Sequence, residues 1–150
     1  MKPARFDYHR PATVEEAIVL LTRYGGEAKL LAGGQSLMPL MNFRVARPAA
    51  LIDLNAIASL AYIREDDGHL RFGAMTRQRT IEFSPLVRRR LPLLAEATSL
   101  VGHLPIRTRG TIGGSLAHAD PSAEYPAVLA ALEGTVVARQ IGRASCRERV

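Results

Sequence analysis

The chain has 150 residues, of which 47% are hydrophobic and 23% are charged. This balance is typical of one soluble globular domain, or of a fragment of a larger chain, and it excludes a disordered protein. The apolar stretches are far shorter than the ~20 residues that a membrane-spanning helix needs. No cationic start followed by an apolar segment marks the amino terminus for export, so we expect a cytoplasmic protein.

The formal net charge of +6 raises the question of nucleic-acid binding. Aromatic residues make up only 5% of the chain and tryptophan is absent, so the stacking platforms typical of that function are missing. We therefore expect no nucleic-acid partner. The run Arg88–Arg90 predicts a solvated face, with a surface that docks a protein partner as the alternative.

The last ten residues, 141–150, differ in kind from the rest of the chain. They include the single cysteine, Cys146, and three arginines. Their sequence, IGRASCRERV, resembles the translation of a common sequencing-adapter oligonucleotide, so we expect a non-native tail; the alternative is a genuine basic terminal segment. Residues 1–140 then contain no cysteine, which excludes disulfides and thiolate metal sites there and fits a reducing cytoplasm.

The first third of the chain predicts alternating strands and helices. Thr13 and Glu16 form a capping box ahead of a helix that Gly25–Gly26 ends, and a short helix is expected over Leu37–Asn42. Three apolar runs complete the alternation as candidate strands: Phe6–Tyr8, Lys29–Ala32 and Ala50–Leu54. This β-α-β order predicts a small sheet with parallel pairing and right-handed connections.

The remainder of the chain predicts a hairpin, three helices and a final strand. Asp67–Gly68 is a strong turn signal between two short strands, and residues 102–114 form a loop punctuated by Gly and Pro. Helices are expected over Thr80–Leu86, over Leu91–Leu100 with Leu93, Leu94, Ala97 and Leu100 inward, and over Ser122–Leu132 behind a cap from Asp120 or Ser122. A strand begins at Thr135–Ala138, and we expect it to be short of partners.

Two segments stand out because they echo each other: Ala32–Leu37 (AGGQSL) and Thr111–Leu116 (TIGGSL). Paired glycines allow a sharp turn and let backbone amides approach a ligand without an intervening Cβ. A concave run of amides binds phosphate oxygens, so two such loops would clamp the diphosphate of a dinucleotide. The alternative is a pair of ordinary turns.

Other nucleotide and metal signatures are missing from the sequence. Neither G-x-G-x-x-G after the first strand nor G-x-x-x-x-G-K-[ST] occurs, which argues against a Rossmann site and a P-loop. His118–Ala119–Asp120 with Glu124 nearby has the residue types of a metal or acid–base cluster. These residues lack the ligand spacing, however, so we expect no metal site.

Residues 1–140 resemble the amino-terminal half of the medium, FAD-binding subunit of molybdenum hydroxylases, the carbon monoxide dehydrogenase/xanthine dehydrogenase family. An ordered set of motifs carries this resemblance: F-x-Y-x-x-P, A-G-G-Q-S-L-x-P-L-M, D-L-x-x-I, G-A-M-T and T-I-G-G-S-L-A-H-A-D-P-S-A-E. The resemblance implies an α+β, two-lobed (PCMH-type) fold. A β-α-β lobe over residues 1–55 would meet a second, truncated α/β lobe over residues 56–140, with FAD in the crevice between them.

The resemblance also implies which residues bind the cofactor. The FAD pyrophosphate would lie between two loops, formed by Ala32, Gly33, Gly34, Gln35 and Ser36 and by Thr111, Ile112, Gly113, Gly114 and Ser115. Glu124 would be a further FAD contact, and Lys29, Leu30 and Leu31 would line the end of the same strand. Many relatives have Asn in place of Ser115, so the shorter side chain puts that one contact in question.

The implied function is electron transfer. A large subunit would carry the molybdenum cofactor, a small subunit would carry [2Fe–2S] clusters, and FAD on this subunit would pass the electrons to an acceptor. No residue here would be a catalytic acid, base or nucleophile. Two alternatives remain: a self-contained flavin oxidase of the same fold, and a non-catalytic nucleotide-binding module. The hydroxylated substrate is not identified, since its site lies on another chain.

Overall fold

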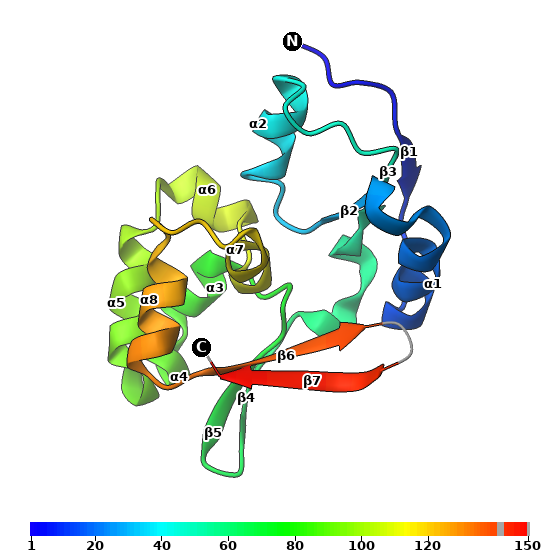
Figure 1. The fold of residues 1–150 in the computed structure, drawn as a ribbon. Helices are drawn as coiled ribbons and strands as arrows, with labels where there is room; N and C mark the ends of the chain where they lie inside the picture. The colour runs from blue at the N-terminus through cyan, green and yellow to red at the C-terminus, as the bar shows by residue number, and fades with distance from the viewer. Residues whose placement is uncertain (141–142, 150) are drawn as a thin grey trace.

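The computed structural model describes residues 1–140 and 143–149. The chain forms two lobes that lie side by side, each around its own hydrophobic cluster (Figure 1). Residues 141, 142 and 150 of the expected tail lie outside the described residues. None of the helices in the described ranges has the length and hydropathy that crossing a bilayer requires.

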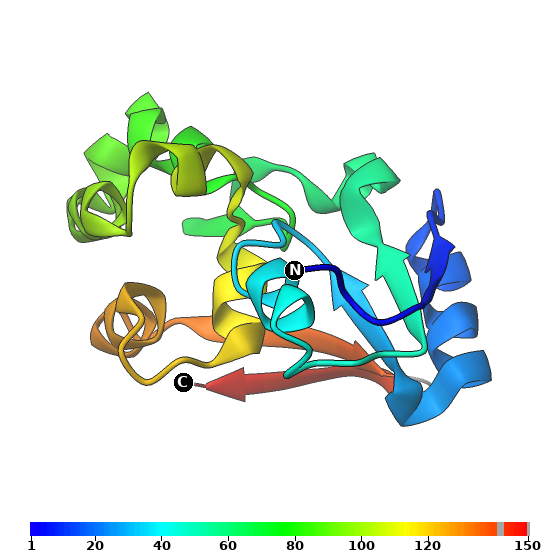
Figure 2. The same ribbon diagram turned by 90° about the horizontal axis from the view of Figure 1, so that it is seen from above.

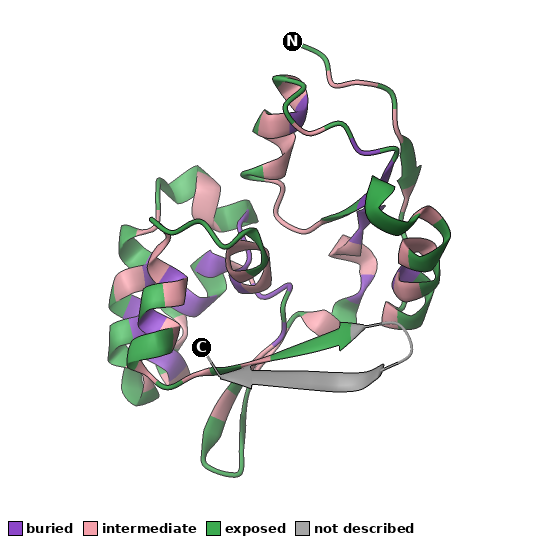
Figure 3. Cartoon of the chain, in the orientation of Figure 1, coloured by how far each residue is buried: buried purple, intermediate pink, exposed green. Residues whose placement is uncertain are grey.

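The first lobe is a parallel sheet with two helices. Its elements are β1 (Asp7–His9), α1 (Val14–Tyr24), β2 (Ala28–Leu31), α2 (Leu37–Asn42) and β3 (Ala50–Asp53). Strand β3 lies between β1 and β2 and pairs in parallel with both, which confirms the predicted β-α-β alternation. All four residues of β3 are buried, as expected of a central parallel strand (Figure 3).

Helix α1 forms for the predicted reason. The Thr13 hydroxyl accepts a hydrogen bond from the Glu16 amide at 3.1 Å, while the Glu16 carboxylate accepts from the Ala12 amide at 2.7 Å. The Glu16 carboxylate therefore bonds to the amide of the residue before the N-cap, whereas in a regular capping box it bonds to the amide of the N-cap itself. The helix ends at Gly25, whose φ of +54° lies in the left-handed region that glycine tolerates.

The second lobe is mainly helical. Its helices are α3 (Gln78–Phe83), α4 (Pro85–Arg90), α5 (Pro92–Leu100), α6 (Leu104–Arg109), α7 (Ile112–His118) and α8 (Glu124–Ala131). The strands are β4 (Ile63–Asp66), β5 (His69–Phe72), β6 (Thr135–Gln140) and β7 (Arg143–Arg149), paired as two antiparallel hairpins. Strands β4 and β5 meet at Asp67 and Gly68, which both have positive φ, so the predicted turn is confirmed.

Proline explains two differences from the expected helices. The helix expected over Thr80–Leu86 is two helices, because Pro85 has no amide hydrogen and Ser84 is extended; the Ser84 hydroxyl caps α4. The expected loop over residues 102–114 contains α6 and α7. Pro105 lies in the first turn of α6, where a missing amide hydrogen costs nothing.

Helix α5 buries only part of the expected face: Leu94 is in the core and Ala97 packs against it, as predicted, but Leu93 and Leu100 are not inward. Leu94, Ala95 and Thr98 are buried, whereas Leu93 is 44% and Leu100 is 70% exposed. A buried threonine is tolerated here because its hydroxyl donates to the Leu94 carbonyl at 2.6 Å and lies 3.1 Å from the Tyr125 hydroxyl. Polar partners across the core therefore decide which face is buried.

The last helix and strand also differ in detail. The N-cap position of helix α8 is occupied by Ala123, which makes no side-chain cap, and not by Asp120 or Ser122. The Asp120 carboxylate instead accepts from the Ser122 amide at 2.8 Å in a preceding turn. Among the described strands, β6 pairs only with β7, which belongs to the expected tail, so it is short of partners as expected but is not without one. Arg139 on β6 forms an ion pair with Glu15 on α1 at 2.6 Å, which joins this hairpin to the first lobe (Figure 2).

Candidate functional site

The structure brings the two glycine segments together. Segment Ala32–Ser36 joins β2 to α2 and lies beside the start of α7 (Figure 2). A Cβ built on Gly33 would come within 2.4 Å of the Arg109 carbonyl oxygen and 2.7 Å of the Gly110 Cα. A Cβ on Gly114 would come within 3.3 Å of the Ala32 Cβ. Gly33 therefore packs against the backbone of residues 109–110, which directly precede the second segment, and Ala32 lies beside Gly114.

The first segment presents hydrogen-bond donors that the protein itself does not use. Among residues 1–140 and 143–149, no protein acceptor lies within hydrogen-bond distance of the backbone amides of residues 33–36. Gly34 has a φ of +73°, which turns the chain sharply and lets successive amides converge. Gln35 Nε2 donates to the Gly33 carbonyl oxygen at 3.1 Å. A run of free, converging amides fits the oxygens of a diphosphate.

The second segment differs from the expected amide cradle. It is the first turn of α7, and the Thr111 hydroxyl accepts from the Gly114 amide at 3.1 Å. The Ile112 and Gly113 amides donate to the carbonyls of Thr76 at 3.1 Å and Ala74 at 2.9 Å. The amides of residues 112–115 are therefore occupied within the protein, so this segment offers the half-buried Ser115 and a close-packed wall, and it lacks the run of free amides that the first segment has.

The glycines of the second segment serve packing. A Cβ on Gly113 would come within 2.6 Å of both the Cβ and the carbonyl oxygen of Ala74, and one on Gly114 within 2.8 Å of Thr111 Oγ1. The first distance is too short for any side chain unless the backbone of Ala74 moves, so Gly113 is required where α7 packs against the chain that follows β5. A Cβ on Gly114 would instead displace the Thr111 hydroxyl that caps α7.

The remaining predicted residues lie around the two segments and form no side-chain hydrogen bond with them within the described residues. Lys29 and Leu30 are exposed on β2, and Leu31 is half-buried, with its Cδ1 3.2 Å from the position of a Cβ on Gly34. Glu124 is the half-buried first residue of α8, which packs beside α7. The structure places it near the second segment, not within it.

A polar network that the sequence did not indicate lies behind the first segment. Asn55 Nδ2 donates to the Ala32 carbonyl oxygen at 3.0 Å and to Asp53 Oδ1 at 2.5 Å. The Tyr8 hydroxyl donates to Asp53 Oδ2 at 2.5 Å. Burial opposes ionisation of Asp53, but the bonds from Tyr8 and Asn55 outweigh it and hold the pKa of this carboxyl below its usual value. Asp53 is thus the anionic anchor of the network.

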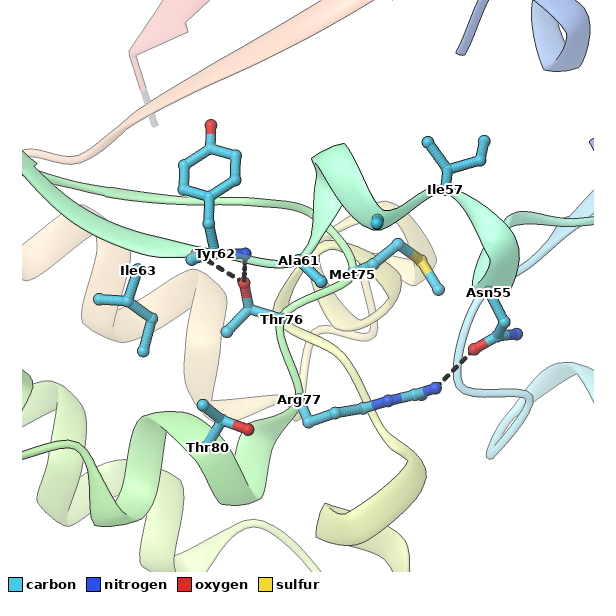
Figure 4. A pocket seen from close by; sticks show the side chains of 10 residues that line it. Asn55, Ile57, Ala61, Tyr62, Ile63, Met75, Thr76, Arg77 and Thr80 are labelled. Atoms are coloured by element: carbon cyan, nitrogen blue, oxygen red, sulfur yellow. Dashed lines mark hydrogen bonds between the residues drawn. The ribbon is translucent and has the colours of Figure 1, made fainter. Parts of the chain in front are cut away.

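Arg77 connects this network to the second segment. Its guanidinium donates to Asn55 Oδ1 at 2.5 Å and to the Arg109 carbonyl oxygen (Figure 4). Partial burial, together with the nearby charge of Arg109, lowers the pKa of Arg77. The backbone of Arg77 also forms an antiparallel bridge with Thr111. One side chain therefore holds groups from both lobes.

A cavity of about 200 Å³ opens beside this network (Figure 4). It is lined by Asn55, Ile57, Ala58, Ala61, Tyr62, Ile63, Met75, Thr76, Arg77 and Thr80. The Thr76 hydroxyl donates to the Tyr62 carbonyl at 2.8 Å and accepts from its amide at 3.2 Å, so polar groups in the wall are already paired. No site residue that the sequence predicted lines this cavity.

The structure also shows the surroundings of the candidate metal residues and of the arginine run. His118 and Asp120 are exposed, and within the described residues no three His, Cys, Asp or Glu side chains group closely enough to hold a metal ion. In the run Arg88–Arg90, Arg88 stacks on Phe83 and Arg90 forms an ion pair with Glu65. Two of the three cations are therefore engaged within the lobe.

A sequence profile for the family described as "FAD binding domain in molybdopterin dehydrogenase" matches residues 4–148. The matched range overlaps residues 141–148 of the expected tail, and the adapter origin of that tail stays a prediction. The 6-hydroxypseudooxynicotine dehydrogenase complex subunit alpha of Paenarthrobacter nicotinovorans is 49% identical over 141 residues, which cover 94% of this chain and 48% of that protein.

The carbon monoxide dehydrogenase medium chain of Hydrogenophaga pseudoflava is also 49% identical, over 137 residues that cover 91% of this chain and 48% of that protein. A solved structure of carbon monoxide dehydrogenase from this organism, which lacks the Mo-pyranopterin moiety of its molybdenum cofactor, has a TM-score of 0.94 at 47% identity and covers 98% of this chain and 52% of that chain. This similarity confirms the expected fold class. The chain spans about half the length of the curated relatives that it matches.

Proposed function

Because this chain belongs to the family of FAD-binding domains in molybdopterin dehydrogenases, we propose that it is the first half of an electron-transfer subunit of a molybdenum hydroxylase. The observation that best supports FAD binding is the run of free amides at residues 33–36, which lies against the backbone of Arg109–Gly110. Bound FAD would supply a redox-active ring that takes electrons from iron–sulfur clusters and gives them to an external acceptor.

The residues of this chain would bind and orient the cofactor. The amides of Gly33, Gly34, Gln35 and Ser36 would donate to the diphosphate oxygens, and the side chains of Gln35, Ser36 and Ser115 would add further donors. Ala32, Thr111, Ile112, Gly113 and Gly114 would form the close-packed wall. Glu124 and the strand end at Lys29, Leu30 and Leu31 would contact other parts of the cofactor.

The rest of the chemistry is assigned to partner subunits. A large subunit would hold the molybdenum cofactor, where substrate is hydroxylated, and a small subunit would hold the [2Fe–2S] clusters. Residues 1–140 contain no cysteine, so they supply no thiolate to such a cluster. The choice of substrate is likewise assigned to another subunit. Two relatives at the same 49% identity are named for carbon monoxide and for 6-hydroxypseudooxynicotine, which are chemically unlike.

The cofactor assignment is tested on the purified full-length subunit. We expect stoichiometric FAD that acid or heat releases intact, because no His or Cys of residues 1–140 is assigned as an attachment site. The flavin-free protein should rebind FAD, measured by quenching of flavin fluorescence. A full-length subunit that folds but binds no flavin would contradict the proposal and favour the nucleotide-binding or scaffolding module.

The electron-transfer assignment is tested in the assembled complex by stopped-flow absorbance. A flavin-free complex should still reduce its iron–sulfur clusters in a single turnover with substrate, yet lose steady-state turnover with acceptors that react at the flavin. Retained turnover without FAD, or loss of cluster reduction together with FAD, would each contradict this order of transfer. Oxidation of substrate by the isolated subunit would favour the self-contained oxidase instead.

A further inference from the structure

We propose that Asn55 and Arg77 are positioning residues that fix the two glycine segments in the spacing that the FAD diphosphate requires. This inference rests on the proposed function. Asn55 holds the first segment through the Ala32 carbonyl. Arg77 holds the chain just ahead of the second segment through the Arg109 carbonyl, and its backbone bridges to Thr111. A direct hydrogen bond joins the two side chains. We call this pair the clamp.

Asn55 controls the direction of the first free amide. The Ala32 carbonyl and the Gly33 N–H belong to one planar, trans peptide group, so they point in opposite directions. When Asn55 Nδ2 holds the Ala32 oxygen at 3.0 Å, the Gly33 N–H is turned away from the network. Asn55 thus orients a donor of the diphosphate cradle without touching the ligand.

The network also fixes the orientation of Asn55 itself. Its Nδ2 donates to Ala32 and Asp53, which are acceptors, and its Oδ1 faces Arg77, which only donates. The opposite orientation of the amide would place donor against donor at Arg77. Its backbone amide also donates to Asp53 Oδ1 at 2.9 Å. Asn55 is therefore held in one rotamer before any ligand binds.

Arg77 is suited to the second half of the clamp. The planar guanidinium reaches two acceptors on different lobes, Asn55 Oδ1 and the Arg109 carbonyl. The Arg109 oxygen is the atom nearest to a Cβ built on Gly33, so the clamp acts directly where the segments touch. Among the described residues, no carboxylate forms an ion pair with Arg77, which leaves its charge available to favour an anionic ligand nearby.

Neither of the two buried hydrophobic clusters joins the glycine segments to each other. The two hydrophobic clusters lie in different lobes and share no residue. Where the segments meet, Gly33 and Gly110 bring only backbone atoms to the contact. Loss of the clamp should therefore leave each lobe folded while the distance between the segments becomes variable, which weakens binding of a ligand that spans both.

The test measures FAD dissociation constants of the flavin-free, full-length subunit. We expect Asn55→Ala and Arg77→Met each to weaken FAD binding by about tenfold or more, since each removes hydrogen bonds that hold the cradle. Arg77→Lys should recover part of the loss, because a lysine reaches one acceptor but not both. The matched control is Arg79→Met, an exposed arginine that stacks on Phe83 and should bind FAD like the parent.

Two further measurements separate positioning from loss of fold. Each variant's melting temperature is measured without flavin, and affinity is compared only where the protein is fully folded. Hydrogen exchange then follows the peptide that contains residues 32–36, where FAD should protect the parent and protect the variants less. If Asn55→Ala and Arg77→Met, or Arg77→Lys and Asn55→Ser where those do not fold, bind FAD with parental affinity, the clamp inference is overturned. A parent subunit that binds no FAD overturns the proposed function itself.

Discussion

Asp53 shows how a single buried charge organises the site. It is 8% exposed, carries the hydrogen bonds of Tyr8 and Asn55, and has a pKa below its usual value of 3.8. Because folding lowers this pKa, ionised Asp53 stabilises the fold above the usual value, and the contribution is lost as the pH falls through the lowered value. The network, and with it Asn55, is therefore weakened by acid.

This linkage predicts how the substitution Asp53→Asn behaves. At neutral pH the variant should be less stable than the parent, because asparagine offers one acceptor oxygen where two are used. The difference should shrink at an acidic pH below the usual pKa of 3.8, because the contribution of the ionised carboxyl to stability is progressively lost there. Urea unfolding at the two pH values measures this. A difference that does not change with pH would show that Asp53 is already neutral in the folded protein.

Which residues could be predicted depended on how local their signals are. Thr13 with Glu16, and Asp67 with Gly68, act within a few residues, and the structure confirms both. The clamp could not be found in this way. Asn55 bonds to Ala32 and Arg77 bonds to Arg109 across 23 and 32 residues of sequence, and neither residue type has a characteristic spacing for such a contact.

The way in which elements meet explains why the second segment begins a helix where a loop was expected. Thr111 looked like part of a loop because Gly and Pro surround it, yet it caps α7 and bridges to Arg77. A helix cap can be recognised from the sequence. The backbone bridge from Thr111, however, depends on the segment around Arg77, which lies in a distant part of the chain. The juxtaposition of the two glycine segments could be predicted. The hydrogen bonds that amides of the second segment form within the protein could not.

The contact between the segments gives a prediction at this scale. Gly33→Ala places a methyl group within 2.4 Å of the Arg109 oxygen, so the segments must separate, and we expect a loss of about 1–3 kcal/mol in the free energy of unfolding together with weaker FAD binding. Gly26→Ala is the matched control, since nothing lies within 4 Å of its Cβ. It should change stability by no more than about 0.5 kcal/mol.

Chemical denaturation of the full-length subunit, followed by FAD titration of the folded fraction, decides between these outcomes. Equal stability of Gly33→Ala and Gly26→Ala would mean that the two segments separate at no cost. In that case the close approach would not be a requirement of the site, and the first loop would bind phosphate by itself.

At the scale of the whole molecule, the two lobes depend on a few connections. Arg77 and Asn55 connect them at the glycine segments, and the ion pair between Arg139 and Glu15 connects the β6–β7 hairpin to α1. The ion pair is exposed on both sides and contributes little to stability. At the glycine segments the lobes are therefore joined by the clamp and by the packing of Gly33 against residues 109–110.

The β6–β7 hairpin carries the last prediction. We propose that residues 141–150 derive from a sequencing adapter, and that the natural reading frame continues into the rest of the second lobe. Strand β7 pairs with β6 with a register irregularity between Ala138 and Gln140, so a short segment of unrelated origin is able to extend the sheet through backbone bonds alone. Resequencing the locus across Arg139 and Gln140 should show an uninterrupted frame. An intact genomic frame that encodes IGRASCRERV and then stops would contradict the adapter origin.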